Sequence, residues 1–113
     1  MTTRDVGNTG ESQVCSYLQE QGYVIVDRNW RTKLCEIDII VSKNAQLYFV
    51  EVKTRKNDHF GDGLDYITSK KLRQMNFAAQ MWLTAHSWRG TVSIAAASVN
   101  NQTSEINFVE LAD

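Results

Sequence analysis

The 113-residue chain lacks the marks of several large protein classes. It has no proline, an absence that by itself indicates no mechanism, and only two cysteines, Cys15 and Cys35. Two cysteines without a partner pattern make neither a disulfide framework nor a zinc site, so we expect free thiols. No apolar run approaches the roughly 20 residues of a membrane helix. The polar start Met1–Asp5 has no apolar segment of a signal peptide, and we expect a soluble, cytoplasmic protein without membrane partners.

The composition is that of a globular protein. Hydrophobic residues make up 42% of the chain and charged residues 22%, which excludes a disordered chain. A chain of this length forms one core, so we expect a single domain over residues 1–113. The net charge is −1, but seven basic residues against three acidic ones fall between Arg28 and Lys56. This asymmetry fits a polyanion-binding face, and solvated surface charge would give the same pattern.

The hydrophobic pattern predicts an α/β fold with a mixed central β-sheet flanked by helices. Val14 and Leu18 at helical spacing indicate a first helix that Gly22 ends, and Thr68 or Ser69 caps a second helix. The expected order is α-β-β-β-α-β-β, with helices over 8–21 and about 69–86 and strands over 23–27, 36–41, 47–54, 91–99 and 105–111. The segment 28–31 is expected to end the first strand, 42–45 to form a hairpin turn and 55–66 a loop. A right-handed crossover would make the strand after the second helix parallel to the strand before it.

Asp38 and the segment Glu51–Lys53 carry the strongest chemical signal. If the hairpin turn is centred on Asn44 and Ala45, pairing outward from it places Asp38 opposite Glu51, with Asp38 on the same face as Glu36. Like charges directly opposite each other destabilise a sheet, and a divalent cation between them would reverse the sign of the interaction. Carboxylate oxygens completed by water and substrate phosphate are the ligands that Mg²⁺ prefers. If such an ion activates water to attack a substrate phosphate, Lys53 would orient that water or stabilise the negative charge that develops on the phosphate.

Glu11 lies on the apolar face of the first helix, because it stands three and seven residues before Val14 and Leu18. A carboxylate buried there without a partner costs several kcal/mol, and a metal site or a basic side chain would provide one. The alternative is a first-turn glutamate that the helix dipole favours. The residues alone leave these two interpretations open.

Asp38 followed after twelve residues by Glu51-Val52-Lys53, with an acid at Glu11, resembles the PD-(D/E)XK nuclease pattern. More closely, the chain resembles the bacterial YraN family, over roughly residues 7 to 85. The resemblance implies a restriction-endonuclease-like fold similar to archaeal Holliday-junction resolvases, with Cys35 where the family usually has glycine. The matching segments are Gly7, Gly10-Glu11, Tyr17-Leu18, Gly22-Tyr23, Arg28-Asn29, Glu36-Ile37-Asp38-Ile39-Ile40, Phe49-Val50-Glu51-Val52-Lys53-Thr54-Arg55, Phe60-Gly61, Lys71 and Trp82-Leu83.

The resemblance also implies roles for single residues. Asp38 and Glu51 would bind Mg²⁺ or Mn²⁺, Glu11 would complete the site, and the backbone carbonyl of Val52 would be a further ligand. Lys53 would be the catalytic lysine. The reaction would be hydrolysis of phosphodiester bonds in nucleic acid, with DNA, including branched or junction DNA, as the expected substrate.

The basic residues around this segment are candidates for phosphate contacts. An enzyme that cleaves both strands of duplex or junction DNA needs two active sites. One chain of this length carries one, so a homodimer would supply both. Two alternatives are a nucleic-acid-binding module without catalysis, whose binding would weaken steeply with salt, and a protein-interaction domain that uses the acidic C-terminal region. The candidate nucleic-acid-binding residues are Arg28, Arg31, Arg55, Lys56, Lys70 and Lys71.

Overall fold

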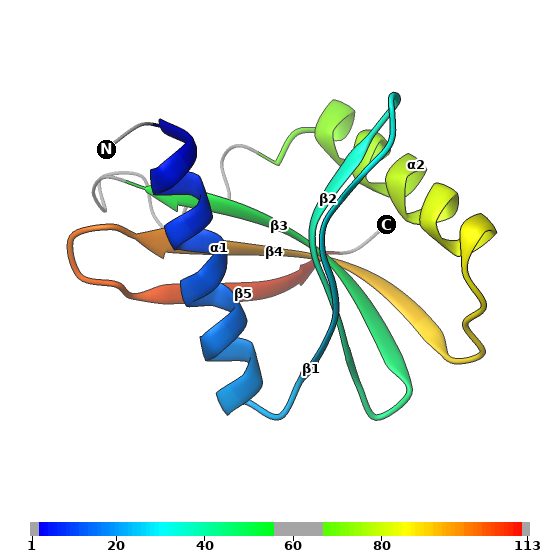
Figure 1. Cartoon of the computed structure of the whole chain (residues 1–113), viewed down its shortest axis with the longest axis horizontal. Helices are drawn as coiled ribbons and strands as arrows, with labels where there is room; N and C mark the ends of the chain where they lie inside the picture. Colours follow the sequence, from blue (N-terminus) through cyan, green and yellow to red (C-terminus); the bar gives the residue numbers. More distant parts are fainter. Residues whose placement is uncertain (1–2, 56–66, 112–113) are drawn as a thin grey trace.

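The computed structural model describes residues 3–55 and 67–111, which form a five-stranded sheet and two helices (Figure 1). This α-β-β-β-α-β-β order is the expected one and is consistent with a restriction-endonuclease-like fold. In the described part of the chain, neither helix is long and apolar enough to cross a membrane. The elements are α1 (Thr3–Glu20), β1 (Val24–Arg31), β2 (Glu36–Lys43), β3 (Gln46–Arg55), α2 (Ser69–Ala85), β4 (Thr91–Asn100) and β5 (Ile106–Leu111).

The strands lie in the order β1-β2-β3-β4-β5, which leaves β1 and β5 at the edges. All neighbours are antiparallel except β3 and β4, which run parallel and are joined through α2, as expected. The two helices cover opposite faces of the sheet, because neighbouring residues of one strand pack against different helices. Val50 packs on the α1 side with Val14 and Leu18, whereas Phe49 packs on the α2 side with Met75 and Trp82.

A tight turn connects β2 and β3. Asn44 and Ala45 both have positive φ angles, of 53° and 64°, which is the geometry of a two-residue hairpin turn. The register from Lys43↔Gln46 to Ile39↔Val50 is the one predicted from a turn centred on these two residues. The turn is shorter than expected, because Ser42 and Lys43 still pair within the sheet.

The expected end of the first strand at residues 28–31 is wrong. β1 continues through this segment, since Arg28 and Trp30 pair with Ile39 and Ile37 of β2. Asn29 takes a φ of 52°, a left-handed conformation that asparagine tolerates better than most residues. The polar segment therefore distorts the strand without ending it.

One end of each helix matches its sequence signal. Gly22 has a φ of 96°, and the Tyr23 amide donates to the Leu18 carbonyl, so glycine ends α1 as predicted. Thr68 caps α2 with its hydroxyl, which accepts a hydrogen bond from the Lys71 amide. α1 begins at Thr3, five residues before the predicted start. Residue 55 belongs to β3, and the remainder of the expected loop, residues 56–66, lies outside the described residues.

Candidate active site

β2 and β3 separate at the level of Asp38. Their backbone pairing stops at Ile39↔Val50, one step before the predicted Asp38–Glu51 pair. Ile37 packs on the α2 side of the sheet, whereas Ile39, two residues later, packs on the α1 side. Regular alternation would put both on one face, so the strand is irregular at Asp38. We expected Glu36 and Asp38 on one face because side chains alternate regularly along a strand. This reasoning does not hold here, since the alternation is interrupted at Asp38.

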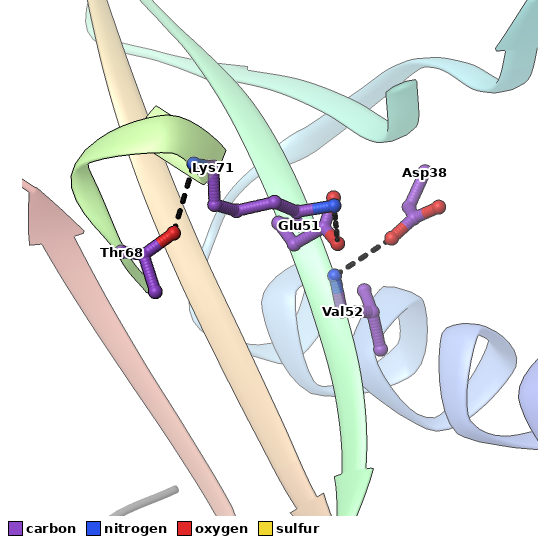
Figure 2. A network of polar contacts seen from close by, with 5 residues as sticks. All are labelled: Asp38, Glu51, Val52, Thr68 and Lys71. Carbon is purple, nitrogen blue, oxygen red and sulfur yellow. Dashed lines mark hydrogen bonds and ion pairs between the residues drawn. The ribbon is translucent and has the colours of Figure 1, made fainter. Parts of the chain in front are cut away.

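Asp38 lies where β2 and β3 separate, a place we call the fork, and its side chain faces the Val52 amide of β3 (Figure 2). Its Oδ2 accepts a hydrogen bond of 2.8 Å from the Val52 amide of β3. Burial, and after it the negative charge of Glu51, raise the pKa of the Asp38 carboxyl to about 7, against the lowering effect of the Val52 hydrogen bond. Glu11 and Glu36 add smaller contributions in the same direction as Glu51. Burial and neighbouring negative charges both disfavour the ionised carboxylate, and a bound cation would stabilise it.

Glu51 lies beside Asp38 and is held by a lysine. Its carboxylate forms an ion pair of 2.8 Å with Lys71 Nζ, which reaches across from the first turn of α2 (Figure 2). The Glu51 side chain is 21% exposed and that of Lys71 34% exposed, so the pair is only partly screened by water. Lys71, expected to contact phosphate, therefore lies at the carboxylates themselves.

Glu11 is the third carboxylate at this place. Gly10 lets α1 approach β3, because a Cβ at that position would overlap the Thr54 hydroxyl. Glu11 Oε1 is buried and has no hydrogen-bond partner among the described residues. Burial raises the pKa of the Glu11 carboxyl, while Arg28 and a hydrogen bond from Asn29 lower it. Glu11 therefore carries an unsatisfied buried oxygen, which is a costly arrangement in the absence of a cation or proton.

The predicted phosphate contacts are spread over a wider area. Lys53, the predicted catalytic lysine, is exposed on β3, and Lys70, a predicted phosphate contact, is exposed at the start of α2. Arg28 is exposed and donates to Ser12 Oγ of α1 at 3.2 Å, and Arg31 lies 3.8 Å from the Glu36 carboxylate. Arg55 is half-buried at the end of β3, four residues beyond Glu51.

The five predicted basic residues that the structure describes have different surroundings. Lys71 is at the carboxylates, Lys70 is beside it, and Arg28 acts on Glu11. Lys56 lies outside the described residues.

Sequence reasoning missed a cleft beside the carboxylates. The cleft has a volume of about 570 Å³ and lies between the segment before β2 and the first half of α2; we name it the α2 cleft. Cys35, which stands where a family glycine was expected, lines it without closing it. The helical spacing of the lining residues on α2 could have indicated that they share one face of the helix. Spacing could not indicate that this face lies opposite Leu34 and Glu36. The lining residues used below are Leu34, Glu36, Glu51, Lys70, Arg73 and Phe77.

The carboxylate oxygens at this place suit a hard divalent cation, although they do not make a complete set of ligands. Within residues 3–55 and 67–111, no three His, Cys, Asp or Glu side chains converge closely enough to hold a metal ion by themselves. The carboxylates of Asp38 and Glu51 and the partnerless Glu11 oxygen are nevertheless the hard oxygen donors that Mg²⁺ and Mn²⁺ take, with water or phosphate as further ligands. The residues present therefore fit such an ion once Lys71 leaves Glu51.

Comparison with known proteins gives one family. Residues 10–109 match the family described as "Uncharacterised protein family UPF0102". The chain is 36% identical over 111 residues to UPF0102 protein VP0448 of Vibrio parahaemolyticus, which covers 96% of this chain and 92% of that protein. A UPF0102 protein of Caldicellulosiruptor saccharolyticus is 34% identical over 99% of both chains. The expected family resemblance is confirmed, and the chain belongs to the UPF0102 (YraN) family.

Proposed function

We propose that this protein is a metal-dependent nuclease that hydrolyses phosphodiester bonds in nucleic acid, with DNA as its substrate. The observation that supports this most is the grouping of three mutually repelling carboxylates, from three elements, around the fork of β2 and β3. Glu11 comes from α1, Asp38 from β2 and Glu51 from β3. Such a group of like charges weakens the fold in the absence of a cation, so a functional reason for it is needed.

Asp38, Glu51 and Glu11 would hold Mg²⁺ or Mn²⁺, with the Val52 carbonyl as a fourth protein ligand. In a strand, the N–H and C=O of one residue point toward the same neighbour. Because the Val52 amide meets Asp38 in the fork, its carbonyl faces the same opening. When bound, such an ion polarises the scissile phosphate and supplies hydroxide at neutral pH.

The chain's own residues would prepare the site for the substrate. Binding of a dication would release Lys71 from Glu51, and the freed ammonium would stand beside the substrate phosphate. Lys53 would stabilise the negative charge that develops on the phosphate. The Val52 amide fixes the Asp38 carboxylate, so its orientation is set before the substrate arrives.

A cleavage assay tests this proposal. Labelled single-stranded and branched DNA are incubated with the protein and Mn²⁺ or Mg²⁺, and the initial rate is compared with the rate in EDTA. We expect Glu51→Gln to lower the rate about 100-fold or more, the scale seen when one group that stabilises developing charge is removed. Glu20→Gln, at an exposed glutamate that ends α1, is the matched control and should leave the rate unchanged. Equal cleavage by the wild type and Glu51→Gln would mean that the activity comes from elsewhere.

The Glu51–Lys71 ion pair favours a second candidate. Lys71 neutralises the Glu51 carboxylate from within the chain, so a nucleic-acid-binding module on a nuclease fold would need no cation at this place. Such a module would bind DNA with a strong dependence on salt, since phosphate contacts release counterions. Its binding would be unaffected by EDTA, and no cleavage would follow in Mn²⁺.

A further inference from the structure

The α2 cleft opens directly beside the carboxylates and has a mixed chemistry. Glu51 lines both the cleft and the fork between β2 and β3. Lys70, Arg73 and Phe77 recur along α2 at positions i, i+3 and i+7, which places them on one stripe of the helix surface. Leu34 stands on the opposite side, in the segment between β1 and β2. Cations and apolar groups therefore share one concave surface.

Two apolar side chains of this cleft are not used in the core. Phe77 is 46% exposed and Leu34 is 73% exposed. α2 packs on the sheet with other residues, Met75, Ala79 and Trp82 among them. An exposed phenylalanine beside cations at a candidate active site is available to a ligand, and flat aromatic faces are the usual platform for unpaired bases.

We propose that the α2 cleft holds one unpaired nucleotide of the substrate strand, next to the bond that is cut. Its base would stack on Phe77, with Leu34 closing the other side, and its phosphates would face Lys70 and Arg73. The inference rests on the proposed nuclease function and narrows it, because it assigns the substrate class: single strands, flaps or branch points with an unpaired base.

Size and charge support this occupant over a duplex segment. A volume of about 570 Å³ is in the range of pockets that take one small ligand. Among the described residues that line it, three cations, Lys70, Lys71 and Arg73, stand against two carboxylates, Glu36 and Glu51, which favours an anion. Bases inside a duplex keep their faces stacked on each other, so they reach an aromatic side chain only after unstacking, at a cost of free energy.

Fluorescence anisotropy of labelled DNA tests the assignment. A short oligonucleotide of mixed sequence and its blunt duplex are titrated with protein in EDTA, which prevents cleavage during the measurement. We expect Phe77→Ala to weaken single-strand binding about fivefold or more, the lower end for loss of one stacked base. Duplex binding should stay unchanged. Phe77→Tyr keeps a flat ring and should bind single strands as the wild type does.

Two further variants separate stacking from charge. Arg73→Met should weaken single-strand and duplex binding alike and lower the salt dependence by about one phosphate contact. Val24→Ala, at an exposed valine of the edge strand β1, should change nothing. Because Phe77 is exposed, the thermal midpoint of Phe77→Ala should match the wild type, which excludes unfolding as the cause.

The outcomes distinguish the two proposals. Equal loss of single-strand and duplex binding in Phe77→Ala, or no loss in either, would overturn the stacking assignment and leave the nuclease proposal standing. Phe77-dependent binding without cleavage by the wild type in Mn²⁺ would overturn the nuclease proposal and leave the stacking assignment. No binding of either DNA at low salt would overturn both.

Discussion

Replacing Asp38 by asparagine should stabilise the protein at alkaline pH while removing metal binding. The variant removes the negative charge, and its amide oxygen can still accept the hydrogen bond from the Val52 amide. Burial and the charge of Glu51 raise the pKa of Asp38 from its ordinary value of 3.8 to about 7. The folded protein therefore holds a proton between these two values that the unfolded chain has already lost.

The sign of the pH dependence follows from this difference. Because the native state binds more protons than the unfolded state in this window, stability falls as the pH rises from about 4 to about 7. The full rise in pKa corresponds to roughly 4 kcal/mol above pH 7, since a tenfold change in proton affinity is about 1.4 kcal/mol. Asp38→Asn escapes this cost but still buries a polar amide, so we expect a gain of about 2–4 kcal/mol.

Urea unfolding measures the effect. The free energy of unfolding of the wild type and Asp38→Asn is compared at about pH 8 and about pH 4, where the carboxyl is protonated and the gain should vanish. Asp38→Ala is the matched control, because it removes the charge and also leaves the Val52 amide without its partner. It should be less stable than Asp38→Asn at both pH values. An Asp38→Asn protein that is no more stable than the wild type at about pH 8 would refute the reasoning.

Three further predictions concern the surroundings of the site. Gly10→Ala should destabilise the fold by about 1–3 kcal/mol in urea unfolding, because its Cβ would overlap the Thr54 hydroxyl, and adding Thr54→Ala should restore most of the loss. If the double variant stays as unstable as Gly10→Ala, the close approach of α1 is not the cause. Lys71→Met should bind Mn²⁺ about tenfold more tightly in calorimetry, since it removes the cation that competes for Glu51; weaker binding would contradict this. Ala45→Gly should raise the free energy of unfolding by about 0.5–1 kcal/mol, because Ala45 has a φ of 64°, and a lower midpoint in thermal unfolding would argue against it.

Local sequence signals were enough for most of the fold. The hairpin register followed from the turn at Asn44 and Ala45, whose positive φ angles match the strand twist. The end of α1 and the start of α2 followed from Gly22 and Thr68, whereas α1 begins five residues before its predicted start. The polar segment at Arg28 was misjudged because pairing with β2 overrides a weak local preference.

The sequence indicated which carboxylates lie near each other at the candidate site, but not which cation lies beside them. The alternation rule brought Asp38 and Glu51 together, but it could not indicate that β2 and β3 separate there and that Asp38 binds the Val52 amide. That irregularity depends on Ile37 and Ile39 packing against different helices, which is a tertiary effect. For the same reason, the pairing of Lys71 with Glu51 required the position of α2 over the sheet.

A titration with Mn²⁺, followed by electron paramagnetic resonance at about pH 8, tests the central claim most directly, because the Asp38 carboxyl, whose pKa is about 7, is then mostly charged. The wild type should bind Mn²⁺ at a site that both Asp38→Asn and Glu51→Gln lose, whereas Glu20→Gln retains it. Mn²⁺ bound equally by all four proteins, or by none of them even with a short DNA present to supply phosphate ligands, would contradict a metal centre at the fork of β2 and β3.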